Sequence, residues 1–245
     1  MNELTSKINH ELLQFGADIV GFGSLSELPD NVRKASPCES HGLPVGVSVA
    51  VSYPPEVIRG IAELPTQAYR EWYDRLNERL DMIVSRGAEL LSGMGYKAIA
   101  QTREYVGSGE SNDNTTLPHK TIATRAGVGW IGKCALLVTD DFGSAIRLSS
   151  LLTDAPLKTA LPVNNSKCGD CMACTTACPG HAVSGKLWEV GLYRDDFFDP
   201  VKCRKTARER AKRGFGGEIT ICGKCIEVCP YTQRYIMKPH EKQTR

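Results

Sequence analysis

The residues best suited to chemistry in this sequence are cysteines, and they lie in two groups. Residues 167–180 read KCGDCMACTTACPG, and residues 222–231 read CGKCIEVCPY. The first group follows the spacing C-x2-C-x2-C-x3-C-P. The second ends in C-x2-C-x3-C-P and has one further cysteine upstream. This spacing is typical of bacterial two-cluster ferredoxins, in which short turns place thiolates around the iron atoms of a [4Fe–4S] cluster.

In such a domain the last cysteine of one run binds the cluster of the other run. The sequence therefore predicts two [4Fe–4S] clusters with eight cysteine ligands. The first cluster takes Cys168, Cys171, Cys174 and Cys229, and the second takes Cys178, Cys203, Cys222 and Cys225. Paired C-x2-C motifs also form zinc sites, but two C-x3-C-P endings that fit a crossed assignment favour iron and sulfur. With every iron ligated, the clusters are predicted to carry electrons and not to bind substrate.

Two cysteines remain outside these groups. Cys134 is predicted to begin a strand as a buried, unreactive thiol, and Cys38 lies in a loop rich in proline and glycine. The ten cysteines in total are expected in a reducing compartment, where they act as metal ligands and not as disulfides. The chain has no long apolar run and a formal net charge of only +2. We therefore expect a cytoplasmic monomer that does not contact a membrane.

Hydrophobic periodicity predicts a mixed α/β unit before the cysteines. The expected helices are 3–15, 66–93 and 119–127, and the expected strands are 17–23, 45–53 and 96–101. The apolar stretches 134–139 and 144–152 flank DDFG, which predicts a hairpin. After residue 152 the periodicity fades and Cys, Pro and Gly dominate. We place a domain boundary near residue 160, with residues 1–160 as one domain and 161–245 as a smaller one that needs its metal to fold.

A glycine-rich segment, AGVGWIGK at residues 126–133, lies between a predicted helix and a predicted strand. Its glycines allow close approach of the backbone to a ligand. Neither a P-loop nor a dinucleotide-binding motif fits, because the segment follows a helix and opens a strand. The alternative is a simple connection in which Trp130 is packed.

Together with the cysteine runs, the stretch DNTTLPHKTIATRAGVGWIGKCALLV at 113–138 resembles the epoxyqueuosine reductase family. These are cobalamin-dependent tRNA-modifying enzymes with two [4Fe–4S] clusters, related to reductive dehalogenases. The resemblance implies an α+β fold class. It consists of a nitroreductase-like, cobalamin-binding α/β domain followed by a bacterial ferredoxin-like domain with two clusters. The sequence resembles a short form that lacks the family's helical-repeat domain after the clusters.

The resemblance also implies roles for particular residues. The cobalamin-binding segment falls on Gly129, Trp130, Ile131, Gly132 and Lys133, and the proton donor falls on Asp113. The family stretch D-[ST]-x-P reads DNTT here, so the backbone around the aspartate differs. The alternative for Asp113 is a surface residue that caps the next helix.

These features predict a corrinoid- and iron–sulfur-dependent reductase. Electrons pass through two clusters to base-off cobalamin, and the substrate is tRNA epoxyqueuosine or a small molecule. The expected donor is a reduced ferredoxin or flavodoxin-type protein. The alternative is a two-cluster electron carrier that reduces a separate corrinoid protein. The basic stretch 202–214 suits either RNA phosphates or a solvated connection between cluster ligands.

Overall fold

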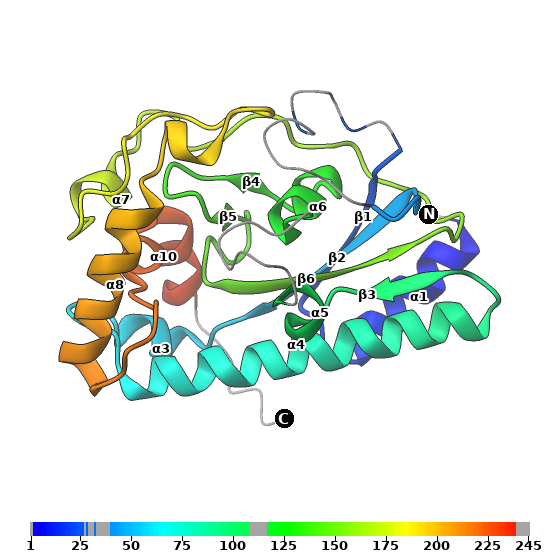
Figure 1. Ribbon diagram of the computed structural model, residues 1–245, viewed down its shortest axis with the longest axis horizontal. Helices are drawn as coiled ribbons and strands as arrows, with labels where there is room; N and C mark the ends of the chain where they lie inside the picture. The colour runs from blue at the N-terminus through cyan, green and yellow to red at the C-terminus, as the bar shows by residue number, and fades with distance from the viewer. Residues whose placement is uncertain (1, 27, 29–31, 33–39, 108–116, 239–245) are drawn as a thin grey trace.

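The computed structural model describes residues 2–26, 28, 32, 40–107 and 117–238 (Figure 1). Asp113 and Cys38 lie outside the described residues. Within the described part, a four-stranded antiparallel sheet carries helices on both faces, and the cysteine-rich segments lie at one end of it. This arrangement confirms the predicted mixture of helices and sheet. No helix in the described ranges combines the length and the apolar character that crossing a membrane requires.

The sheet has the order β1-β2-β6-β3, and every neighbouring pair is antiparallel. The strands are β1 (Ile19–Ser24), β2 (Val45–Ser52), β3 (Ala98–Ala100) and β6 (Ile146–Thr153). The predicted hairpin around DDFG forms only at its turn, where Thr139 and Gly143 make an antiparallel bridge, and its two strands do not pair with each other. Strand β6 pairs with β2, with Val47 opposite Leu151, and the stretch before DDFG pairs elsewhere. The two longest strands, β2 and β6, pair with each other, and apolar residues of both are buried.

Two helices cover the sheet face formed by the odd-numbered residues of β2. They are α1 (Glu3–Gln14) and α4 (Gln67–Gly93), both close to their predicted ranges. The Thr66 hydroxyl accepts the Tyr69 N–H at 3.2 Å and caps the start of α4. Helix α4 buries Leu80, Ile83 and Leu91 in the main core. Each such side chain contributes about 1.5–3 kcal/mol when it leaves water.

The opposite face of the sheet carries α6 (His119–Arg125), which lies on the far side of the sheet from α4 in Figure 1. This face is lined by small residues. A Cβ atom on Gly46 would lie 2.8 Å from Ile122 Cγ2, and one on Gly23 would lie 2.7 Å from the Ala126 nitrogen. The glycines therefore let α6 approach the strands closely.

After α6 the chain forms a small two-stranded ribbon of β4 (Trp130–Ile131) and β5 (Leu137–Val138). Residues 132–136 make the turn between these strands, and Ala135 within it has a φ of 60°. The sequence predicted that Cys134 begins a strand. In the structure Cys134 lies in this turn instead. The turn faces the cysteine-rich part of the chain.

The remaining elements are short, apart from one helix. They are α3 (Pro55–Arg59), α5 (Arg103–Gly107), α7 (Ala173–Thr176), η1 (Arg194–Asp196), α8 (Pro200–Phe215), α9 (Lys224–Glu227) and α10 (Pro230–Met237). The main core takes Ile226, Tyr235 and Ile236 from beyond residue 160, and the Tyr235 hydroxyl donates to the Tyr53 carbonyl at 2.8 Å. The two predicted domains thus share one core, and the boundary near residue 160 stays a prediction.

Candidate metal centre and the adjoining turn

The eight predicted ligand cysteines all lie in the described part, and each is partly exposed. Short helices start or end at several of them. Cys229 is the N-cap of α10, and Pro230 after it occupies the first helical position, where a missing N–H costs nothing. The Ala182 N–H donates to the Cys178 sulfur at 3.3 Å. Such backbone donors stabilise a thiolate and the cluster that it holds.

The fold brings thiols from distant parts of the sequence together. Cys229 interacts electrostatically with Cys168, although about sixty residues separate them. Cys203 interacts in the same way with Cys222 and Cys178. Helices α7 and α9, which carry parts of the two cysteine runs, pack against each other. These neighbours follow the crossed arrangement that the spacing predicts, with the last cysteine of each run beside the other run.

Among the described residues, no three His, Cys, Asp or Glu side chains converge on a point where one ion would sit. The ligands of a [4Fe–4S] cluster bind four separate irons, so they surround a volume instead of meeting at a point. Burial, with smaller effects from Cys222 and Cys178, raises the pKa of the Cys203 thiol to about 11. Binding of iron must therefore displace a proton from this sulfur. Half-buried thiols in crossed groups, with backbone donors, fit a pair of clusters.

The turn after Trp130 contacts the first cysteine run directly. A Cβ atom on Gly132 would lie 3.5 Å from the Cys168 sulfur, which is van der Waals contact, and only 2.9 Å from Val138 Cγ2. Lys133 is only 4% exposed, and its Nζ donates to the Cys171 carbonyl at 3.0 Å. The segment predicted to bind cobalamin therefore holds the loop of the first predicted cluster in place. Whether its backbone also contacts a corrin stays a prediction.

Trp130 is fully buried between the two parts of the chain. Its ring meets Tyr231 edge to face with 4.8 Å between centroids, and the Lys167 ammonium lies 5.1 Å from the ring centroid. Trp188 belongs to the same apolar cluster. Within the described ranges, the indole Nε1 of Trp130 is buried and has no hydrogen-bond partner. A buried donor without a partner costs free energy, so this atom suits a bound acceptor such as an amide oxygen of a corrin.

Cys134, in the same turn, reaches both predicted clusters. Its thiol lies within hydrogen-bonding reach of Cys174 and of Cys225, one ligand from each cluster. It is buried, as the sequence predicted. The turn therefore contacts the first cysteine run through Lys133 and Gly132 and both runs through Cys134.

Two cations, the partly buried Lys120 and the buried Arg125, fix this turn and the segment that leads to the cysteines. The Lys120 Nζ donates to the Ala135 carbonyl at 2.6 Å, and burial, then Arg194, lowers the pKa of Lys120 to about 8. Arg125 is 6% exposed and donates to the Val163 carbonyl at 2.9 Å. A basic residue in a short helix gives no sequence signal for burial, since its partners are carbonyl groups brought close only by folding.

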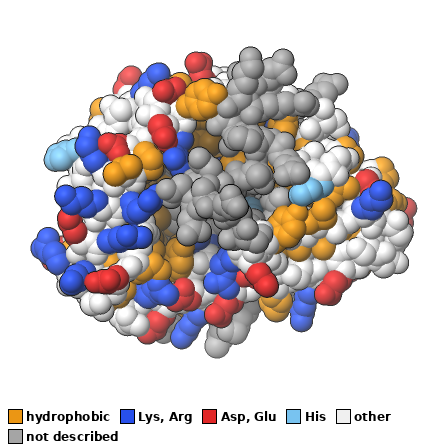
Figure 2. All heavy atoms as spheres, in the orientation of Figure 1, with side chains coloured by type: hydrophobic (Ala, Val, Ile, Leu, Met, Phe, Trp, Pro, Cys, Tyr) orange, Lys and Arg blue, Asp and Glu red, His pale blue; other side chains and the backbone are white. Residues whose placement is uncertain are grey.

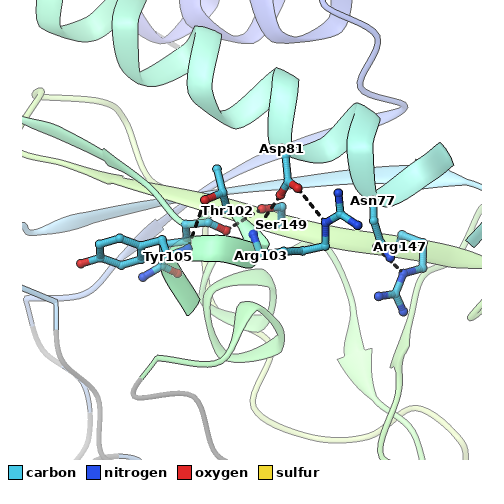
Figure 3. A network of polar contacts seen from close by, with 8 residues as sticks. Asn77, Asp81, Thr102, Arg103, Tyr105, Arg147 and Ser149 are labelled. Carbon is cyan, nitrogen blue, oxygen red and sulfur yellow. Dashed lines mark hydrogen bonds and ion pairs between the residues drawn. The ribbon is translucent and has the colours of Figure 1, made fainter. Parts of the chain in front are cut away.

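Described residues that flank the stretch containing Asp113 in the sequence contact strand β6. On its N-terminal side, Asp81 of α4 accepts from the Arg103 Nε at 2.7 Å, next to Ser149 (Figure 3). The Ser149 hydroxyl donates to the Gln101 carbonyl at 3.1 Å, and the Ser150 hydroxyl donates to the Gln101 side chain at 2.9 Å.

On the C-terminal side of that segment, Leu117 is buried and His119 begins α6. The His119 Nδ1 lies 2.8 Å from the Ser150 hydroxyl oxygen. Burial, then the nearby Arg147 charge, lowers the pKa of His119 to about 4, so the ring is neutral near pH 7. Described residues on both sides of that stretch thus contact neighbouring serines of one strand.

Comparisons with known proteins support the cluster assignment. Residues 167–232 match the family model described as a 4Fe-4S double cluster binding domain, which confirms the predicted pair of clusters. The epoxyqueuosine reductase of Synechococcus sp. (strain CC9605) is 35% identical over 130 residues, which are 53% of this chain and 40% of that protein. The chain spans about half the length, or less, of the curated relatives that it matches.

Solved structures share the fold of nearly the whole chain. One of them is a reductive dehalogenase whose structure suggests a mechanism for B12-dependent dehalogenation. Its match to this chain has a TM-score of 0.68 at 20% identity. It covers 92% of this chain and 31% of that one. An epoxyqueuosine reductase bound to a tRNA-Tyr epoxyqueuosine-modified stem loop has a TM-score of 0.59 at 19% identity, over 94% of this chain and 66% of that one. At these identities the likeness establishes the fold.

Proposed function

Because this chain belongs to the epoxyqueuosine reductase family, we propose that it is a cobalamin- and iron–sulfur-dependent reductase of the reducing cytoplasm. The observation that carries the proposal is the packing of the Gly132–Lys133 turn against Cys168 and Cys171. This contact joins the segment that resembles the family's cobalamin loop to a predicted electron carrier. A reductase needs these two sites to be adjacent, because electrons must pass from one to the other.

The cysteines divide between two carriers. Cys168, Cys171, Cys174 and Cys229 would hold the cluster beside the turn, and Cys178, Cys203, Cys222 and Cys225 would hold the other. When bound, base-off cobalamin would supply a cobalt centre able to deliver two electrons to the substrate. The chain's contribution there is the backbone of residues 129–133 and the unpartnered Trp130 Nε1, which would donate to an acceptor on the corrin.

Asp113 would give a proton to the substrate atom that gains electron density. Its role rests on the resemblance alone, because it lies outside the described residues.

The substrate we propose carries a C–O bond that is reduced, either epoxyqueuosine in tRNA or a smaller molecule. A tRNA substrate is supported by the related reductase bound to a modified tRNA stem loop. The electrons would come from a reduced ferredoxin or flavodoxin-type protein. Reduction of a C–O bond takes two electrons, so the donor would have to act twice for each turnover.

The first test is a titration of anaerobically prepared, cluster-loaded protein with cob(II)alamin, followed by EPR. About eight irons per chain and a base-off Co(II) signal are expected. Replacing Trp130 by Phe keeps the ring but removes the Nε1 donor, and should weaken cobalamin binding by about tenfold, the value of one hydrogen bond. The matched control is Trp188→Phe in the same apolar cluster, which should bind cobalamin as the parent does.

Eight irons with only the signal of free cobalamin would contradict the reductase proposal. That result would favour the alternative, a two-cluster electron carrier for a separate corrinoid protein. If cobalamin binds, Asp113→Asn should leave both the EPR signal and the iron content unchanged. It should lower turnover of an epoxyqueuosine-modified stem loop by about 100-fold or more, as loss of a general acid does.

A further inference from the structure

Helix α8 separates its residues into an inward and an outward face. Ala207 and Ala211 are buried, and Cys203 lies one helical turn before Ala207 on the same side. The exposed positions of α8 define what we term the α8 basic face, and these are Val201, Lys202, Lys205, Arg208, Glu209, Lys212, Arg213 and Gly214, so Glu209 is its one acidic residue. Figure 2 shows Lys and Arg side chains gathered on the left side of the molecule, where Figure 1 places α8.

The charge of this helix is far from the average of the chain. Residues 200–215 contain seven Lys or Arg and one Glu, whereas the whole chain has a net charge of only +2. The remainder of the molecule is therefore net negative. Lys202 pairs with Asp199 at 3.2 Å and Lys212 with Glu218 at 3.7 Å. In the part of the chain that the structure describes, no acidic side chain pairs with Lys205 or Arg213.

A cluster ligand lies directly behind this basic face. Cys203 is part of α8 and interacts with Cys178 and Cys222, the other ligands assigned to the second cluster. The first cluster lies behind the turn of residues 132–136, with Cys168 and Cys229 in the apolar cluster around Trp130. A protein that binds to the α8 basic face is therefore next to ligands assigned to the second cluster.

The same face has an apolar residue within its positive surround. Val201 is 71% exposed at the start of α8, and Tyr193, 49% exposed, lies shortly before the helix in sequence. Transient protein interfaces combine such apolar contacts with a charged rim that speeds and orients the encounter. No exposed aromatic residue occurs within α8 that would stack on a base, as single-stranded RNA binding sites usually have. The combination favours a protein partner over RNA.

We propose that the α8 basic face docks an acidic one-electron donor of the ferredoxin class, which delivers electrons to the second cluster. The proposal rests on the proposed function, because it assumes that the cysteines hold clusters. In the transfer, one electron leaves the reduced centre of the donor and one electron enters a [4Fe–4S] cluster of this chain. No bond is made or broken and no proton moves.

The test measures binding of an acidic [2Fe–2S] ferredoxin to the cluster-loaded chain by surface plasmon resonance. The variant is Lys205→Glu/Arg213→Glu, which reverses the two unpaired charges. At an ionic strength of about 0.01 M, where the Debye length is about 30 Å, Kd should rise about tenfold or more. At about 1 M, where the Debye length is about 3 Å, parent and variant should differ by less than about twofold.

The matched control is Lys7→Glu/Lys158→Glu, which changes the net charge by the same amount on and beside α1. Figure 1 places α1 at the opposite end of the molecule from α8. Both positions are exposed, and the Lys158 backbone N–H donates to the Thr5 hydroxyl of α1. Its ferredoxin Kd should rise much less than that of Lys205→Glu/Arg213→Glu, because the Coulomb interaction weakens with distance from the docking face.

An equal loss of ferredoxin binding in the two double variants would overturn the proposal, since it would show an effect of net charge alone. So would an unchanged ferredoxin Kd together with a lost affinity for a tRNA stem loop, which would make α8 an RNA-binding surface. Iron content, checked first, shows that each variant retains its clusters. Cobalamin takes no part in the assay, so a failure of the cobalamin titration leaves this result interpretable.

Discussion

The buried Lys133 offers a sharp test of how the turn supports the first cluster. Its ammonium donates to the Cys171 carbonyl at 3.0 Å and lies 3.4 Å from the Met172 sulfur. Lys133→Met keeps most of the side-chain volume but removes the charge and the donor. A hydrogen bond to a charged group contributes about 1.5–3 kcal/mol, and the Cys171 carbonyl would be left without this donor.

That loss should act locally, on the loop that carries Cys168 and Cys171. If the loop must open before a chelator can remove iron, 1.5–3 kcal/mol corresponds to a population of the open state about 10- to 100-fold larger. The assay follows anaerobic iron release to a strong ferrous chelator in excess, read by absorbance. Release should be faster by this factor in Lys133→Met, while circular dichroism before the addition of chelator shows the parental secondary structure.

The matched control is Lys167→Met, which makes the same replacement beside the same loop. Lys167 is exposed, with its ammonium 5.1 Å from the Trp130 ring centroid, and pairs with Asp140 at 3.4 Å, with side-chain exposures of 54% and 69%. Exposed pairs contribute about 0–1 kcal/mol, so iron release should change by less than about fivefold. If Lys133→Met released iron no faster than Lys167→Met, the turn would not be what holds the first cluster loop, and the reasoning from this contact would fail.

Three further predictions follow from the same structure. Cys134→Ala should retain about eight irons per chain, whereas Cys203→Ala should lose about half; an equal loss in both would make Cys134 a ligand. Gly143→Ala should lower the free energy of unfolding, measured in urea, by about 2–4 kcal/mol. Gly143 has a φ of 57°, and an added Cβ would overlap the Thr232 nitrogen. A change below about 1 kcal/mol would contradict this. Between pH of about 6.5 and about 5 the unfolded chain binds more protons than the folded one at His119, whose pKa is lowered to about 4. Stability should therefore fall by about 1–2 kcal/mol over that range, and His119→Gln should remove that part of the pH dependence.

The cluster ligands could be predicted from sequence because their geometry is local. Two-residue spacings fix which thiols share a tight loop, and the C-x3-C-P endings specify the exchange of ligands between the runs. Long helices such as α4 and apolar strands such as β2 were equally clear, because their periodicity extends over many residues. In these cases each residue's environment repeats along the chain, so the pattern alone identifies the element.

The tertiary structure decided how those elements meet. The hairpin predicted around DDFG is limited to the Thr139–Gly143 bridge, because β6 pairs along its length with the distant β2 and β5 pairs with β4. The glycine-rich segment was expected to face a cofactor, yet Lys133 and Gly132 contact the cysteine loop. Likewise, nothing in the local sequence marks Lys120 as a partner of the Ala135 carbonyl. Such contacts join residues far apart in the chain, and only the folded backbone brings their donors and acceptors within hydrogen-bonding distance.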